Sequence, residues 1–180
     1  MSDFIKMISV LFIACGLAAG SLAIVDMVTK EPIANWDKKQ KEIALREVFT
    51  TADEFKELTA NKVWEARNNG QKAGNIFLTE VQGYSGPITL MFGIDVEYKI
   101  TGFKVLSHTE TPGLGAKITK SQFRDQFKDK SLEQIILKKD NPGKGTIDTI
   151  TAATISSRAV TRAVSATFES FMKDKGRENQ

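Results

Sequence analysis

The chain has 180 residues, a formal net charge of +3 and 26% charged residues, which suits one compact domain with a short appendage. Lysines and acidic residues are mixed along the chain, which excludes the basic patch of a nucleic-acid binder. The single cysteine, Cys15, and the single histidine, His108, exclude an internal disulfide and any iron–sulfur or zinc site built from this chain alone. A redox role therefore requires an organic cofactor.

The first predicted element is a membrane-spanning helix at residues 7–25. This stretch, MISVLFIACGLAAGSLAIV, has no charged residue and is about as long as the hydrocarbon core requires. A cleaved signal peptide is the alternative, because residues 18–21 are small enough for a peptidase. The apolar run continues to Val25 without a polar segment, which favours a retained anchor. Only Lys6 precedes the span and more lysines follow it, so a simple charge count places the rest in the cytoplasm.

Helical segments are expected between this span and the folded domain. Pro32 is predicted to break the helix that follows the span. Residues 35–49, NWDKKQKEIALREVF, then have the spacing of an amphipathic helix, and a second short helix is expected at residues 52–58. The chain is thus expected to divide into a transmembrane anchor (1–30), a helical stalk (31–59) and a folded domain (60–180).

The folded domain is predicted to be α+β, with a mostly antiparallel sheet and flanking helices. Asn69-Gly70 predicts a hairpin turn between its first two strands. Apolar residues at helical spacing predict a short helix at 122–127 and a long one at 156–173, with Ser156 or Ser157 as its N-cap. Stretches rich in apolar residues and bounded by turn residues predict strands at 63–67, 76–81, 88–94, 100–107 and 133–138.

Three loop segments have residues that could carry chemistry. DTITAATISS (148–157) places hydroxyl side chains and small alanines before a helix, whose N-terminus favours a phosphate; an ordinary helix cap is the alternative. HTETPGLG (108–115) holds Leu114 between two glycines, where it could cover a flat ring, although a simple connecting loop has the same residues. GYSGPI (83–88) is a turn whose Tyr84 could flank a cofactor or simply pack.

Together with the membrane helix, these three segments resemble the FMN-binding proteins shared by the Rnf complex and the sodium-pumping NADH:quinone oxidoreductase. The chain is most similar to the G subunit of the bacterial Rnf electron-transport complex. In that family a segment of the type D-x-x-(S/T)-(G/A)-A-T is recognised by a flavin transferase, which links FMN through its phosphate to the last threonine. Many members have glycine at the position of Ala152, and alanine disfavours the positive φ that glycine adopts easily. The pattern falls here on Asp148, Thr151, Ala152, Ala153 and Thr154.

The resemblance therefore implies covalent FMN on Thr154. It also implies that the ETPGLG loop lines the flavin ring, and it adds no catalytic residue and no metal ligand. The remaining candidate contacts of the cofactor are Asp148, Thr151, Ala153, Ser157, Glu110, Thr111, Gly113, Leu114 and Tyr84.

The function implied by the resemblance is electron transfer in a membrane-bound, ion-translocating ferredoxin:NAD oxidoreductase, with no substrate chemistry by this chain alone. The implied partners are the other subunits of the Rnf complex, the flavin transferase and membrane lipid, and not nucleic acid. The domain is expected on the extracytoplasmic side of the bacterial inner membrane, against the lysine count. Two alternatives stay open: the C subunit of the quinone reductase, and a non-redox membrane-tethered binding or assembly domain.

Overall fold

The computed structural model describes residues 2–178 and contains two compact units, Met1–Lys41 and Glu42–Gln180. Helix α1 (Ser2–Val48) begins in the first unit, and its last residues belong to the second. The expected division into a transmembrane anchor, a helical stalk and a folded domain stays a prediction.

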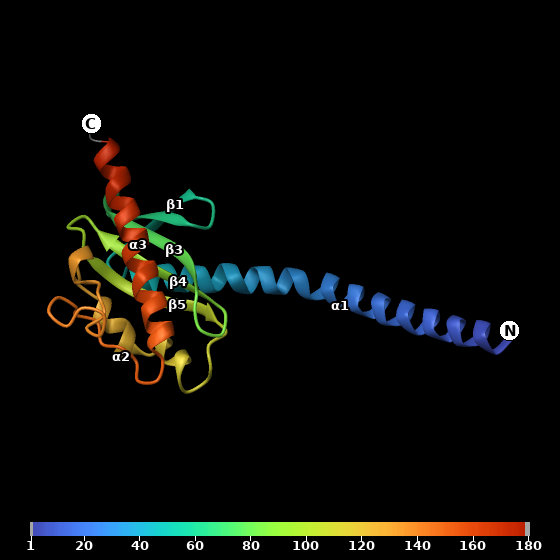
Figure 1. The fold of residues 1–180 in the computed structure, drawn as a ribbon. Coiled ribbons are helices and arrows are strands. Elements are labelled where there is room, and N and C mark those ends of the chain that lie inside the picture. Colours follow the sequence, from blue (N-terminus) through green and yellow to red (C-terminus); the bar gives the residue numbers. More distant parts are fainter. Residues whose placement is uncertain (1, 179–180) are drawn as a thin grey trace. The chain divides into compact units, whose positions relative to one another are not determined.

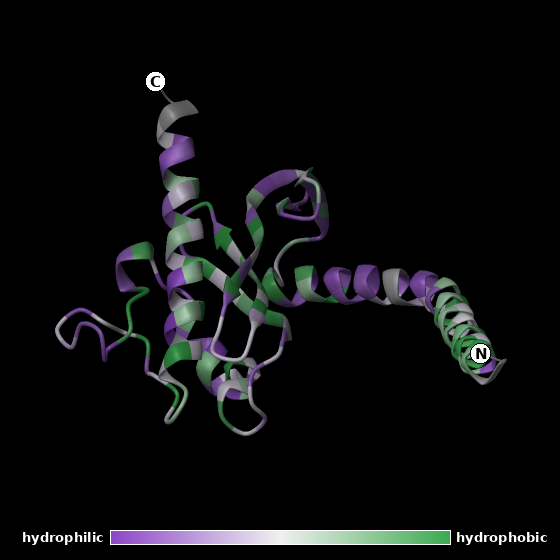
Figure 2. Ribbon diagram, turned by 45° about the vertical axis from the view of Figure 1, so that its right-hand side comes forward, coloured by the Kyte–Doolittle hydropathy of each residue, from purple (hydrophilic) through white to green (hydrophobic). Residues whose placement is uncertain are grey.

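Among the described residues, α1 is the one helix that is long and apolar enough to cross a membrane. Its N-terminal part consists mostly of hydrophobic residues, whereas hydrophilic residues are frequent further along (Figure 2). Large apolar side chains lie exposed there, with Phe12 at 80% and Met27 at 79% of full exposure. A continuous apolar surface of this kind is rare on soluble monomers and typical of a helix that contacts lipid.

The expected break at Pro32 is wrong, because α1 continues through this residue. A proline inside a helix removes one hydrogen bond and costs about 3 kcal/mol. The residues that follow it include several lysines, glutamates and alanines, which are good helix formers. Their combined preference offsets the single lost bond.

The second unit is built on a five-stranded sheet in which neighbouring strands are antiparallel and follow one another in chain order (Figure 1). This confirms the predicted α+β architecture. The hairpin at Asn69-Gly70 is also confirmed, and both residues have positive φ, 50° and 75°, as a type I′ turn requires. The strands are β1 (Glu54–Thr59), β2 (Val63–Asn68), β3 (Gln71–Gln82), β4 (Pro87–Asp95) and β5 (Ile100–His108).

Two predicted elements are wrong. Residues 52–58 are not helical, because this segment pairs with β2 and forms the edge strand β1. Residues 133–138 do not form a strand: the 3₁₀ helix η3 (Leu132–Gln134) is followed by a single bridge between Leu137 and Ile147. In both segments, contacts with distant residues decide the conformation, and local preference does not.

The sheet separates two apolar layers, because successive side chains of a strand point to opposite faces. On one face, Met91 packs with Ala44, Leu45 and Val48 from the end of α1. On the other face, Leu90 belongs to a larger core that also includes apolar residues of the C-terminal helix and the short helices. The short helices are η1 (Gly115–Thr119), α2 (Ser121–Arg124) and η2 (Asp125–Phe127).

The C-terminal helix α3 (Thr154–Glu178) crosses this second face of the sheet (Figure 1). Val160, Val164 and Phe168 recur at helical spacing and are buried there, as predicted. The helix begins at Thr154, so the expected N-cap role of the two serines that follow is wrong. Both serines lie inside the first turn, where their hydroxyls bond to neighbouring loops.

Candidate functional site

The three loop segments singled out in the sequence meet around one open cavity of about 370 Å³. The walls come from the β3–β4 turn, the loop after β5, and the turn that leads into α3. A cavity of this size can hold a substantial part of a cofactor. Its lining residues are Tyr84, Glu110, Thr111, Leu114, Gly115, Ala152, Ala153, Thr154, Ile155 and Ser156.

The turn before α3 is tight and strained at one residue. The N–H of Ala153 donates to the carbonyl of Ile150 at 3.0 Å, and Ala152 has a φ of 62°. Glycine adopts positive φ at no steric cost, whereas alanine pays about 1 kcal/mol or more. Ala152 therefore occupies a backbone conformation for which glycine is better suited.

This strain predicts opposite effects for two neighbouring substitutions. Ala152→Gly relieves the unfavourable φ and is expected to raise stability by up to about 1 kcal/mol, even though glycine has more freedom in the unfolded chain. Ala153→Gly is the matched control: Ala153 is buried at 6% exposure without positive φ, so the change should destabilise the fold by about 1 kcal/mol. Thermal unfolding of the two variants checks this, and equal shifts in the same direction would contradict it.

Thr154 is the first residue of α3 and lies half-buried at the cavity. The Lys139 ammonium donates a hydrogen bond to the Thr154 hydroxyl, with 3.3 Å between Nζ and Oγ1. The first N–H groups of any helix lack partners within the helix, and its N-terminus carries a partial positive charge. The Thr154 oxygen is thus surrounded by groups that favour a negative charge.

An ion pair links the Lys139 loop to α3. The Arg158 guanidinium binds the Asp140 carboxylate with two hydrogen bonds, at 2.8 and 2.5 Å. Hydrogen bonding to Arg158 holds the pKa of Asp140 below its usual value. Since Asp140 follows Lys139 directly, this contact keeps the lysine close to the start of α3.

The hydroxyls of Ser156 and Ser157 bond in different directions. Ser156 donates to the Glu110 carboxylate at 2.6 Å, beside the cavity. Ser157 donates to the carbonyl of Ala153 at 2.9 Å and accepts from the N–H of Ile150 at 3.1 Å. Ser157 therefore stabilises the turn before α3, whereas Ser156 binds Glu110 in the wall of the cavity.

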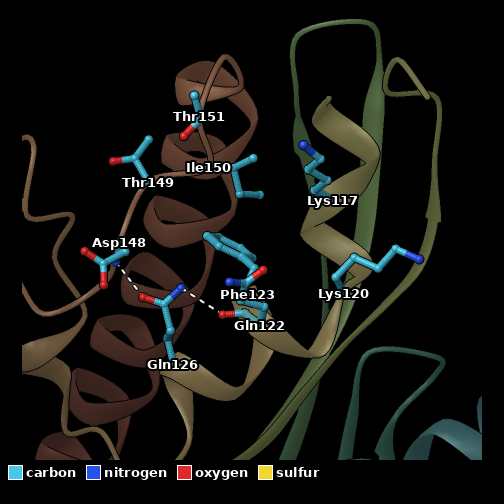
Figure 3. A pocket seen from close by; sticks show the side chains of 9 residues that line it. All are labelled: Lys117, Lys120, Gln122, Phe123, Gln126, Asp148, Thr149, Ile150 and Thr151. Atoms are coloured by element: carbon cyan, nitrogen blue, oxygen red, sulfur yellow. Dashed lines mark hydrogen bonds between the residues drawn. The ribbon is translucent and has the colours of Figure 1, made fainter. Parts of the chain in front are cut away.

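A second cavity, of about 490 Å³, lies on another side of the same turn, between α2 and residues 148–151 (Figure 3). The N–H of Asp148 donates to the Gln126 side chain at 2.6 Å, and the Gln126 amide donates to the carbonyl of Gln122 at 3.2 Å. Lys138 forms a salt bridge with Asp148 at 2.9 Å. Although this cavity is larger, only the first of the two contains Thr154 and all three motif loops, so we take the first as the candidate site.

The predicted site residues are thus divided between two places. The first cavity gathers Tyr84, Glu110, Thr111, Leu114, Ala153 and Thr154. Asp148 and Thr151 line the second cavity, and Gly113 and Ser157 line neither. Two residues at the candidate site were not predicted from the sequence. Lys139 is one of two adjacent lysines without a motif around them. Ser156 has the pattern of a helix cap, and its contact with the cavity wall was missed. Contact of any of these residues with a cofactor stays a prediction.

Comparison with known proteins finds an FMN-binding domain family and relatives that are G subunits of oxidoreductase complexes. Residues 83–169 match the FMN-binding domain family, and this range covers all three motif segments and continues into α3. The chain is 34% identical over 160 residues to the G subunit of the proton-translocating ferredoxin:NAD(+) oxidoreductase complex of Clostridium ljungdahlii, covering 88% of this chain and 86% of that protein. It is 30% identical to the G subunit of the ion-translocating oxidoreductase complex of Methanosarcina acetivorans, over 97% of both chains.

Two solved structures share the fold. One is NqrC of Shewanella oneidensis, with a TM-score of 0.51 and 23% identity, over 59% of this chain and 54% of that one. The other is the C subunit of the Na(+)-translocating NADH-quinone reductase of Parabacteroides distasonis, with a TM-score of 0.52 and 27% identity, over 62% and 60%. The sequence relatives cover far more of the chain than these structures do.

Proposed function

Because the chain belongs to the family of G subunits of ion-translocating oxidoreductase complexes, we propose that it transfers electrons within such a complex through an FMN linked covalently to Thr154. The observation that carries this proposal is the single cavity lined by Tyr84, Leu114 and Thr154, which come from three separate loops. Relatives named for ferredoxin:NAD(+) oxidoreductase complexes suggest ferredoxin and NAD as the outer partners of the whole complex.

The residues around the cavity fit FMN. Tyr84 is 69% exposed and Leu114 is 43% exposed, so both offer apolar surface to a flat ring. Lys139 and the start of α3 lie at the Thr154 hydroxyl, where a phosphate would need compensation of its charge. A phosphodiester keeps about one negative charge, and a helix N-terminus stabilises such a charge by about 0.3–1 kcal/mol.

FMN, when bound, supplies the electron-accepting and electron-donating chemistry. The residues of this chain hold it in place and set its surroundings. Leu114 and Tyr84 would pack against the ring, Lys139 would compensate the phosphate, and the ester on Thr154 would prevent dissociation. A flavin transferase would make this ester from a flavin pyrophosphate: the Thr154 oxygen would attack the phosphorus next to the flavin, the P–O–P bond would break, and the hydroxyl proton would go to the departing phosphate group. The other subunits of the complex would be the electron partners.

In-gel fluorescence tests the proposal directly. The full-length chain, produced in cells that contain a flavin transferase, is denatured and separated by electrophoresis. A covalent flavin travels with the chain and fluoresces at its position, whereas a non-covalent flavin is lost. The same chain from cells without the transferase is the control, and a dark band from both sources would refute covalent attachment.

Leu114→Ala tests whether the ring lies in this cavity. Removal of an apolar side chain from the flavin face is expected to shift the flavin absorption spectrum and leave the attachment intact. Leu58→Ala is the control, because Leu58 is also exposed, at 50%, but belongs to the edge strand β1. Absorption spectra of the two loaded variants decide the matter, and an unchanged Leu114→Ala spectrum places the ring elsewhere.

We further propose that residues 7–25 remain in the mature protein as a single span and that the second unit lies outside the cytoplasm. The uncharged, exposed surface of residues 7–25 in α1 supports the span. A reporter enzyme that is active only outside the cytoplasm, fused after α3, should be active, and a cytoplasm-only reporter should be silent. The reverse pattern, or a mature chain beginning after Gly20, would contradict this topology.

A further inference from the structure

One carboxylate joins the three walls of the cavity. The Glu110 side chain lies in the loop between β5 and η1 and is only 4% exposed. Its Oε1 accepts hydrogen bonds from the N–H groups of Tyr84 at 2.7 Å and Ser85 at 3.1 Å. Its Oε2 accepts the hydroxyl hydrogen of Ser156 at 2.6 Å. The side chain therefore bridges the β3–β4 turn and the first turn of α3.

This carboxylate is compensated by dipoles and not by a cation. Within residues 2–178, no lysine, arginine or histidine forms an ion pair with Glu110. Two of its three partners are backbone N–H groups, which can only donate, so the acceptor oxygens of a carboxylate suit them. Burying a charge without a counter-ion is costly. A charge that is costly to bury and lies at the cavity wall is therefore expected to have a function in the cavity.

Glycines leave room for the carboxylate on both sides. A Cβ added at Gly83 would lie 2.2 Å from Oε1, and one added at Gly115 would lie 2.3 Å from Oε2. Neither distance is sterically possible, so any other residue at either position would displace the carboxylate. Two close approaches by separate segments indicate that the chain is built around this side chain.

We infer that Glu110 is a positioning residue that fixes the walls of the flavin cavity and, through its fixed negative charge, lowers the reduction potential of the flavin. The inference rests on the proposed function, because it requires a flavin in this cavity. Electrons added to the flavin make it more negative, and a like charge nearby destabilises that form. The effect is strong where water is excluded, as it is around a side chain with this burial.

Glu110→Gln separates the charge from the geometry. The glutamine carbonyl can accept from Tyr84 and Ser85, and its amide can donate to the Ser156 oxygen, so all three contacts can persist without the charge. Glu133→Gln is the matched control, because Glu133 is exposed and the same charge is removed there. Spectroelectrochemistry on the full-length, flavin-loaded chains should give a more positive midpoint potential for Glu110→Gln and no shift for Glu133→Gln.

An unshifted potential in loaded Glu110→Gln would overturn the electrostatic role. A wild-type chain without flavin would instead defeat the proposed function, so the two failures are distinguishable. If glutamine prevents folding, Ser156→Ala replaces it. That variant keeps the charge and removes one of its donors, so the midpoint potential should move to more negative values. A purely structural disturbance gives no reason for opposite shifts in the two variants, and an unshifted Ser156→Ala would also count against the inference.

Hydrogen exchange tests the positioning role without any flavin. In the full-length chain produced without transferase, Glu110→Ala should accelerate amide exchange at Tyr84 and Ser85, because their N–H groups lose their acceptor. Exchange at these two amides in Glu110→Gln should stay close to wild type. Unchanged protection in Glu110→Ala would show that other contacts hold the turn, and would overturn this role.

Discussion

Thr154→Val is expected to remove covalent flavin from the full-length chain completely. A phosphoester requires a hydroxyl oxygen, and valine keeps nearly the shape of threonine without one. The fold should survive, because within residues 2–178 the Thr154 hydroxyl forms one hydrogen bond, with the exposed Lys139 side chain. Intact mass measurement after production with the transferase should give the bare chain mass for the variant, and the chain mass plus one FMN minus water for wild type.

The neighbouring hydroxyls provide the controls. Thr154→Ser keeps a hydroxyl at the same place and should still be loaded. Thr151→Ala should also retain flavin at Thr154, in reduced amount if the transferase reads the hydroxyl at residue 151. Asp148→Ala should impair loading, because the resemblance places it in the recognised motif. Flavin mass persisting in Thr154→Val would move the attachment to another residue and refute the central proposal.

Gly102→Ala is expected to destabilise the second unit by about 1–3 kcal/mol, as overpacking does in a filled interior. A Cβ at this position would lie 2.6 Å from the carbonyl oxygen and 3.0 Å from the Cα of Val48. Both are backbone atoms, and the same carbonyl accepts a hydrogen bond from Thr101 at 2.8 Å. The end of α1 therefore cannot move away without the loss of that bond and of the apolar packing beneath it.

Thermal unfolding of the full-length chain in mild detergent measures this effect. A change of 1 kcal/mol corresponds to about 2–4 °C for a protein of this size. Gly143→Ala is the control, because the nearest atom to an added Cβ there is 3.9 Å away. Its free energy of unfolding should stay within about 0.5 kcal/mol of the wild-type value. Equal midpoints for the two alanine variants would contradict the predicted clash.

The parts of the fold that follow from local sequence were predictable. Strands β2 to β5 have apolar runs bounded by turn residues, and Asn69-Gly70 specifies the hairpin between β2 and β3. Strand β1 was not predictable, because EFKELT has several helix-favouring residues and only Phe55 of this segment is half-buried. Its conformation depends on pairing with β2, and the residues of the segment alone do not predict that pairing.

The candidate site divides in the same way. The motif residues Thr154 and Leu114 could be identified from their sequence patterns, and the structure places both at one cavity. The burial of Glu110 could not be predicted, because a glutamate in a loop rich in polar residues and glycine normally faces water. Its partners, Tyr84, Ser85 and Ser156, are separated from it by 25 to 46 residues along the chain. Only the folded arrangement satisfies this carboxylate.

Under the proposed topology, the proline within α1 would limit how deeply the helix enters the bilayer. Pro32 has no N–H, so the carbonyl of Val28, four residues earlier, lacks its helical partner. With residues 7–25 in the hydrocarbon core, Val28 lies about 4.5 Å beyond the last of them along the helix axis, at the level of the lipid headgroups. Water can reach a carbonyl there. A shift of one helical turn into the bilayer would carry it into hydrocarbon, where an unpaired backbone group costs several kcal/mol. Under the proposed topology, the Val28 carbonyl would therefore oppose a deeper insertion of α1.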